Sequence, residues 1–329
     1  ICRLADQPVK LMDAFLNSLS ATLQITAPVF IIVFLGVLFK HWRWLDDNFV
    51  KIASTLVFRV TLPTLVFLNI SKTNLRESLD PSVLLYASAV TLISFFFLIW
   101  AARLLVSVPA DRGVFIQGSF RGNQGIIGMA LVANQFGEAG LPIASLLLGC
   151  LIIIYNILSV IALSTSQPER AGMGWKPVFM DIAKNPLILS VVLALPFSYF
   201  QWSLPPLLLK TGTYFSGMTL PLALLCIGAS LSLKALRASS LASWGATAMK
   251  LAILPVIMTW GAWYLGWTGQ TLGILFLYFA SPTAAGSFVM AKAMGANGVL
   301  AANIVALTTV GSTLTVTLGV FLLHWLQLV

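Results

Sequence analysis

Long apolar runs constrain this chain more than any other feature of its sequence. No charged side chain occurs from Ser82 to Ala102, and similar runs recur along all 329 residues. A helix needs about 20 mostly apolar residues to span a bilayer, and the chain has room for about ten such spans. Only 9% of the residues are charged, and the mean hydropathy is +0.95, which no ordinary soluble domain matches. The sequence therefore predicts an all-α polytopic membrane protein.

The basic balance of the chain does not indicate nucleic acid as a partner. The net charge is +9, but the Lys and Arg residues form no basic block or aromatic-basic surface. In a membrane protein such a balance places basic residues in cytoplasmic loops. The cysteines and histidines show no metal-ligand or nucleophile–base pattern. We expect neither an enzyme nor a bound metal or cofactor.

The chain contains an internal repeat. An ungapped offset of 158 residues aligns Pro28 with Pro186, Trp44 with Trp202, and the Thr-Leu-Pro triplet at Thr61 with the one at Thr219. The same offset aligns further glycines: Gly128 with Gly286, Gly137 with Gly295, and Gly140 with Gly298. Each half holds five predicted spans. Because five is odd, the second half must enter the membrane from the opposite side, an inverted 5+5 repeat common among secondary transporters.

The predicted spans and segments follow from this repeat. The first half spans the membrane at 19–39, 49–70, 82–106, 113–136 and 139–165, and the second at 182–200, 206–231, 242–266, 270–294 and 298–326. A polar stretch, 1–11, precedes a natural-looking start at Met12. The repeats are 12–166 and 182–329, joined by a cytoplasmic linker, 167–181. The loop side rich in Lys and Arg is expected inside, which puts both termini outside a bacterial cytoplasmic membrane. A homodimer is left open.

Spans four and nine contain residues that a spanning helix normally avoids. Span four reads RGNQGIIG from Arg121 to Gly128, and span nine reads ASPTAAGS up to Ser287. Glycine weakens a helix, and Pro282 leaves the carbonyl of Tyr278 without its helical donor. Interrupted backbone is tolerated at membrane depth only where protein or a watery cavity satisfies it. Matching interruptions in two repeats indicate the midplane site of a transporter.

Two broken helices that cross would offer helix N-termini with free amides, which suit a carboxylate. The predicted substrate-binding residues are Arg121, Asn123, Gln124, Gly125, Gly128, Ser281, Pro282, Thr283 and Ser287. Further candidate contacts to an ion or substrate are Arg59, Asn156, Lys292 and Asn303. Lys250, near the start of span eight, is expected to snorkel to the membrane surface. The alternative is glycine-mediated helix packing, with polar groups bonded across spans.

These stretches resemble the auxin efflux carrier family, within the bile acid/sodium symporter superfamily. The resemblance rests on TLPTLVFLNIS, GNQGIIGMALVANQFGEAGL, TLPLALLCIGASLSL and ASPTAAGSFVMAKAMGA, and it covers nearly the whole chain from Met12. It implies ten spans, a scaffold and a transport domain, and broken helices four and nine crossing around an organic-anion site with Asn123 at the carboxylate. Bacterial members include permeases for malate or related acids. Family members commonly carry a proline shortly after the glycines of span four, where this chain has Gly128-Met129-Ala130.

We therefore expect a secondary transporter that moves a small organic anion, a carboxylate, by alternating access. The shortage of acidic residues within the spans weakens proton coupling through a carboxylate, so a uniporter or exchanger fits well. The alternatives are a sodium-coupled organic acid symporter of the bile acid transporter type and a non-transporting membrane sensor on the same fold.

Overall fold

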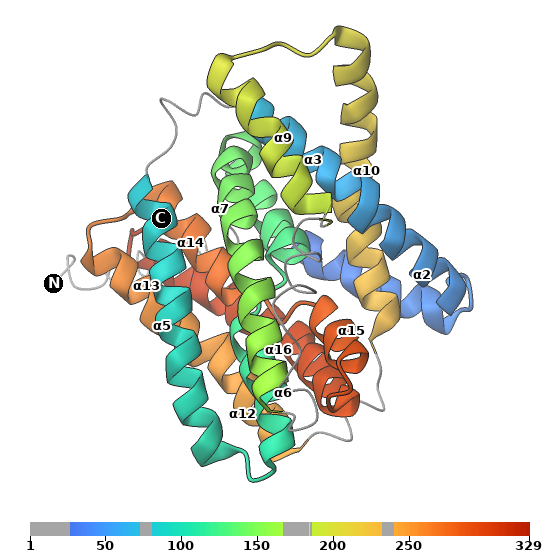
Figure 1. Cartoon of the computed structure of the whole chain (residues 1–329). Coiled ribbons are helices and arrows are strands. Elements are labelled where there is room, and N and C mark those ends of the chain that lie inside the picture. The colour runs from blue at the N-terminus through green and yellow to red at the C-terminus, as the bar shows by residue number, and fades with distance from the viewer. Residues whose placement is uncertain (1–26, 73–80, 167–183, 185, 232–239) are drawn as a thin grey trace, which may run out of the picture.

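The structure is a computed structural model that describes residues 27–72, 81–166, 184, 186–231 and 240–329 (Figure 1). The predicted polar stretch 1–11 and the linker 167–181 lie outside these residues. Within the described part the chain is helical, and its one β interaction is an isolated bridge between Gly122 and Thr283. The prediction of an all-helical chain is confirmed for these residues.

One group of helices packs together on one side of the molecule (Figure 1). It comprises the helix Ala27–His41, α2 (Asp47–Leu56), the π-helical segment η1 (Val57–Thr61), α3 (Leu62–Ser71), α9 (Pro186–Phe200) and α10 (Pro206–Ser230). Glycine permits the closest of these contacts. A Cβ atom at Gly36 would lie 2.3 Å from the carbonyl oxygen of Leu225, so only glycine lets the backbones approach this far.

The second group holds the remaining helices. It comprises α5 (Pro81–Leu105), the 3₁₀ turn η2 (Pro109–Asp111), α6 (Arg112–Phe120), the π-helical segment η3 (Gln124–Gly128), α7 (Met129–Thr165), α12 (Leu241–Ala248), the π-helical segment η5 (Met249–Ile253), α13 (Leu254–Tyr264), α14 (Gly269–Ala280), α15 (Gly286–Ala293) and α16 (Gly298–Trp325). The two groups meet where α7 packs on α3 and α9, and where η3 packs on α10.

Two tight backbone turns fall at glycines that the repeat aligns. Gly137 interrupts α7 with φ 58° and ψ −148°, at the predicted boundary between spans four and five. Gly295, between α15 and α16, has φ 73°. Positive φ is a conformation that glycine adopts without steric strain. The aligned glycines thus have the same physical use in both halves of the chain.

The helices have the length and surface of membrane spans. Within the described part of the chain, six helices are long and apolar enough to cross a bilayer. Three shorter apolar helices accompany them: Ala27–His41, Ile188–Phe200 and Gly269–Ala280. Large apolar side chains such as Phe96, Val256 and Leu314 are more than half exposed, which a protein in water rarely tolerates over so many positions. This supports the polytopic membrane protein. The ten spans and the inverted repeat remain predictions.

Candidate functional site

Two helices of the second group are interrupted, one in each half of the sequence. α6 ends at Phe120, Arg121 is extended with ψ 99°, and the helix resumes at Gln124 as η3 and α7. α14 ends at Ala280, Ser281 is extended with ψ 135°, and the chain becomes helical again at Gly286. The interruptions therefore fall on the glycine-rich and proline-containing stretches that the sequence singled out.

The two extended segments lie side by side and satisfy each other's backbone. Gly122 and Thr283 form an antiparallel bridge. The amide of Asn123 donates to the carbonyl of Pro282 at 2.6 Å, and the amide of Ala284 donates to the carbonyl of Arg121 at 3.0 Å. Unpaired backbone groups are costly at membrane depth, and these bonds remove part of that cost. We call these two segments, 121–123 and 281–285, the crossing.

Side chains complete the bonding of the helix ends at the crossing. Three carbonyls in the last turn of α14 accept a side-chain donor: Leu277 from Ser281 Oγ at 2.7 Å, Tyr278 from Gln124 Nε2 at 3.3 Å, and Phe279 from Lys250 Nζ at 3.1 Å. At the end of α6, Thr283 Oγ1 donates to the carbonyl of Gly118 at 2.6 Å. Gln124 thus supplies a donor to the Tyr278 carbonyl that Pro282 deprives of its helical partner.

Arg121 is held beside the beginning of α15. Its Nη2 donates to Asn156 Oδ1 at 3.0 Å, and its Nη1 donates to Ser159 Oγ at 3.2 Å and to Met290 Sδ at 3.1 Å. A Cβ atom on Gly286, the first residue of α15, would lie 3.8 Å from Nη2. The guanidinium is half-buried, and its described partners are all neutral. Two predicted residues, Arg121 and Asn156, are therefore in direct contact.

Polar side chains at and beside the crossing have unused hydrogen-bonding capacity, and one is Gln124, whose Oε1 has no partner among the described residues. Asn123 is 7% exposed and precedes the first residue of η3, yet its side chain makes no capping hydrogen bond there. Ser287, in the first turn of α15, is 2% exposed, and its hydroxyl has no partner among the described residues. These groups lie at the N-terminal ends of two helical segments, where the first backbone amides lack partners within the helix. At α15 the amides of Ser287 and Phe288 donate instead to the carbonyls of Ala284 and Ala285.

The glycines of span four make room for neighbouring helices. A Cβ atom on Gly125 would lie 3.4 Å from Leu62 of α3, across the boundary between the two groups. A Cβ atom on Gly128 would lie 2.9 Å from the hydroxyl of Ser281, which is too close. Gly128 therefore serves close packing, which is the alternative interpretation of these glycines, whereas a Cβ atom at Gly125 would make only ordinary contacts.

The other predicted residues fall in different places. Arg59 is exposed on η1, and Asn303 is buried in α16 at 2% exposure. Lys292 lies in α15, but its side chain is outside what the structure describes.

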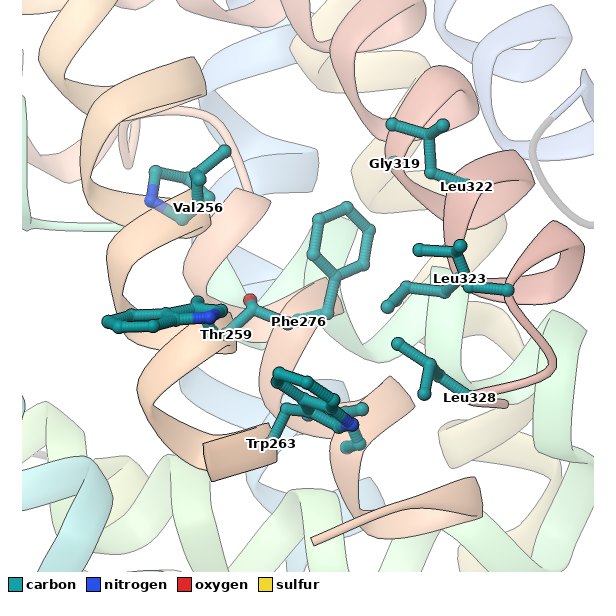
Figure 2. Close-up of a pocket in the computed structure, with 12 residues that line it drawn as sticks. Val256, Thr259, Trp263, Phe276, Gly319, Leu322, Leu323 and Leu328 are labelled. Carbon is teal, nitrogen blue, oxygen red and sulfur yellow. The ribbon is translucent and has the colours of Figure 1, made fainter. Parts of the chain in front are cut away.

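A cavity of about 470 Å³ between α13, α14 and α16 has an almost wholly apolar lining, including Val256, Phe276 and Leu323 (Figure 2). None of the predicted site residues lines it.

The expectation for Lys250 is wrong. It does not snorkel to a surface but is 3% exposed, with its ammonium at the crossing. The physical reason lies in the helix around it. Pro255 cannot donate a backbone hydrogen bond, the preceding turn widens into the π-helical segment η5, and η5 packs against α6, α14 and α16. The residue therefore lies inside the bundle.

A polytopic helical chain whose interrupted helices meet within the bundle has the architecture of a membrane transporter. The chain belongs to the membrane transport protein family, the auxin efflux carrier family, whose family model matches residues 22–320. It is 27% identical over 300 residues to an uncharacterized transporter of Methanocaldococcus jannaschii, which covers 88% of this chain and 95% of that protein. It is 23% identical over 266 residues to an uncharacterized transporter of Methanothermobacter thermautotrophicus, covering 80% of this chain and 85% of that protein.

Proposed function

We propose that this membrane transporter is a secondary carrier for an organic anion, a carboxylate, and that the anion binds at the crossing. The observation that carries the proposal is the position of Arg121. Its guanidinium lies beside the beginning of α15, and its partners among the described residues are all neutral. A helix N-terminus carries about half a positive charge, and a guanidinium binds carboxylates through paired hydrogen bonds. The two together favour an anion.

The polar groups with spare capacity support the same chemistry. The side-chain amide of Asn123 and the hydroxyl of Ser287 can each donate to a carboxylate oxygen. Asn123 precedes η3 and Ser287 lies in the first turn of α15, so the two donors come from both interrupted helices. An anion between the two groups would accept the hydrogen bonds that neither group donates to a described residue.

The proposed transport mechanism is alternating access, in which one helix group moves against the other. The crossing belongs to the second group, and Gly125 packs against Leu62 of the first. A shift between the groups would move the crossing past α3 and α10 while leaving its internal bonds intact. The aligned turns at Gly137 and Gly295 favour an inverted repeat, which would give the inward and outward states similar geometry.

A thermal-shift screen of the purified chain tests the substrate class. Monocarboxylates, dicarboxylates and their neutral amides are added separately, in sodium chloride and in potassium chloride. We expect one or more acids to raise the unfolding midpoint saturably, their amides to have no effect, and sodium to make no difference. Stabilisation only with sodium would favour the sodium-coupled symporter. No stabilisation by any acid would remove the carboxylate proposal.

A matched pair of arginine variants locates the site. Arg121→Gln should abolish most of the stabilisation by the best acid, with a larger loss for a dicarboxylate than for a monocarboxylate. Arg103→Gln makes the same change at an exposed arginine in the last turn of α5 and should keep the full response. Equal responses in the two variants would place the acid elsewhere.

A further inference from the structure

Lys250 brings a buried basic side chain to the crossing that the proposed anion site does not use. Its side chain is 3% exposed and reaches the crossing from η5, a π-helical segment in the second group. π-Helical turns within α-helices recur at functional sites. A charged side chain at membrane depth is expensive and as a rule has a function.

The ammonium of Lys250 lies at the C-terminal end of α14. Its Nζ donates to the carbonyl of Phe279 at 3.1 Å, and Nζ also lies 3.1 Å from where a Cβ atom on Gly122 would be. The end of α14 carries partial negative charge on carbonyls that lack a helical donor. Gly122 leaves room for the ammonium directly beside the bridge between the two interrupted helices.

This contact is not part of an ion pair. Among the described residues the single salt bridge joins Lys40 to Asp47, and the remaining described carboxylates, Asp46, Asp111 and Glu138, make no contact with Lys250. The ammonium has three donors and the described residues supply one acceptor. Among the described residues, its charge therefore faces the negative end of the α14 dipole.

In transporters with discontinuous helices, the C-terminal ends of half-helices and unwound carbonyls bind the coupling cation. We propose that the ammonium of Lys250 occupies this cation position at the end of α14 as a tethered cation. The crossing then needs no inorganic cation, because the chain supplies one. The inference rests on the proposed function only in taking the crossing to be the transport site.

Removal of the tethered cation should open the position to a free one. The purified full-length chain is unfolded thermally in choline chloride, with sodium chloride or n-propylammonium chloride added at constant ionic strength. Propylammonium has the length of the side chain that Lys250→Ala removes. We expect the wild type to respond equally to all three salts. Lys250→Ala should unfold several degrees lower in choline, and sodium or propylammonium should restore its midpoint saturably.

Lys210→Ala is the matched control, because Lys210 is exposed on α10. It should behave as the wild type in every salt. If Lys250→Ala and Lys210→Ala respond identically to the added cations, the proposal is overturned. The cation experiment uses no organic acid. Its result can therefore contradict the tethered-cation proposal while the acid screen supports the carboxylate proposal, or the opposite.

Two further variants decide the case if Lys250→Ala does not fold. Lys250→Arg keeps the charge, whereas Lys250→Gln keeps a donor for the Phe279 carbonyl without the charge. The proposal requires Lys250→Arg to unfold independently of the added cation and Lys250→Gln to depend on it. A Lys250→Gln protein that is as stable as the wild type in choline overturns it. The proposal is also overturned if neither variant folds in any of the salts, because packing alone would then require lysine at this position.

Discussion

At the scale of single residues, the adjacent residues Asn123 and Gln124 have different roles at the crossing. The amide group of Gln124 donates to the hydroxyl of Tyr155 at 2.8 Å and to the carbonyl of Tyr278 at 3.3 Å, so it holds the fold. The side chain of Asn123 makes no hydrogen bond to cap η3, and its backbone alone ties the two interrupted segments together. A substitution can therefore separate binding from folding.

Asn123→Ala should weaken binding of the best carboxylate and leave the unfolding midpoint of the free protein almost unchanged. Losing one hydrogen bond to a charged group costs about 1.5–3 kcal/mol, which corresponds to roughly a ten- to hundredfold loss of affinity. Titration of the acid against wild type and variant measures this loss. Unchanged affinity in a folded Asn123→Ala protein would remove span four from the site.

Gln124→Leu should show the opposite pattern. It leaves the Tyr278 carbonyl and the buried Tyr155 hydroxyl without this donor, and unsatisfied buried groups cost about 1–3 kcal/mol each. Thermal unfolding without any ligand measures the effect. A variant as stable as the wild type would mean that other groups satisfy these atoms.

At the scale of helices, the turn at Gly137 depends on its backbone conformation alone. An added Cβ atom would meet nothing within 4 Å at Gly137 or at Gly217, but Gly137 has φ 58° whereas Gly217 lies inside α10. Gly137→Ala should destabilise the protein by about 1–3 kcal/mol, because a φ of 58° with a ψ of −148° lies in a region that residues other than glycine rarely adopt. Gly217→Ala should stabilise it by about 0.5–1 kcal/mol. Midpoint shifts of the same sign in the two variants would contradict this account.

The sequence predicts the helix interruptions but not all of their partners. Pro282 and the glycines after Arg121 disfavour a helix locally, so the breaks can be read from the residues themselves. The donor to the Tyr278 carbonyl comes from Gln124, 154 positions earlier, and only the tertiary fold brings the two together. The sequence does not predict the burial of Lys250, because this burial depends on η5 packing against α6, α14 and α16. Pro255, which follows η5, is the sequence feature that indicates an irregular turn there.

At the scale of the whole molecule, orientation in the membrane tests the inverted repeat. Glu138 follows the turn at Gly137, and Asn297 follows the aligned turn at Gly295; both side chains are exposed. An inverted repeat places these aligned turns on opposite sides of the bilayer. Asn297 donates to Asp111 at 3.0 Å, which puts it at the end of the bundle near Arg112.

We expect Glu138→Cys to react with an impermeant thiol reagent from outside the cell, and Asn297→Cys only after the membrane is opened. The substitutions are made in a chain whose own three cysteines are replaced. The excess of Lys and Arg on the Asn297 side predicts that this side lies in the cytoplasm. Labelling of both positions from the same side would contradict the inverted repeat.

Counterflow in liposomes tests the central claim most directly. Vesicles containing the purified chain are loaded with the unlabelled acid that gave the largest thermal shift, and uptake of the same radiolabelled acid is followed in potassium chloride without sodium. An organic-anion carrier predicts saturable accumulation that exceeds the outside concentration for a time, and that falls strongly in Arg121→Gln but not in Arg103→Gln. Uptake that never exceeds equilibrium, or that is equal in both variants, would contradict a carrier with its anion site at the crossing.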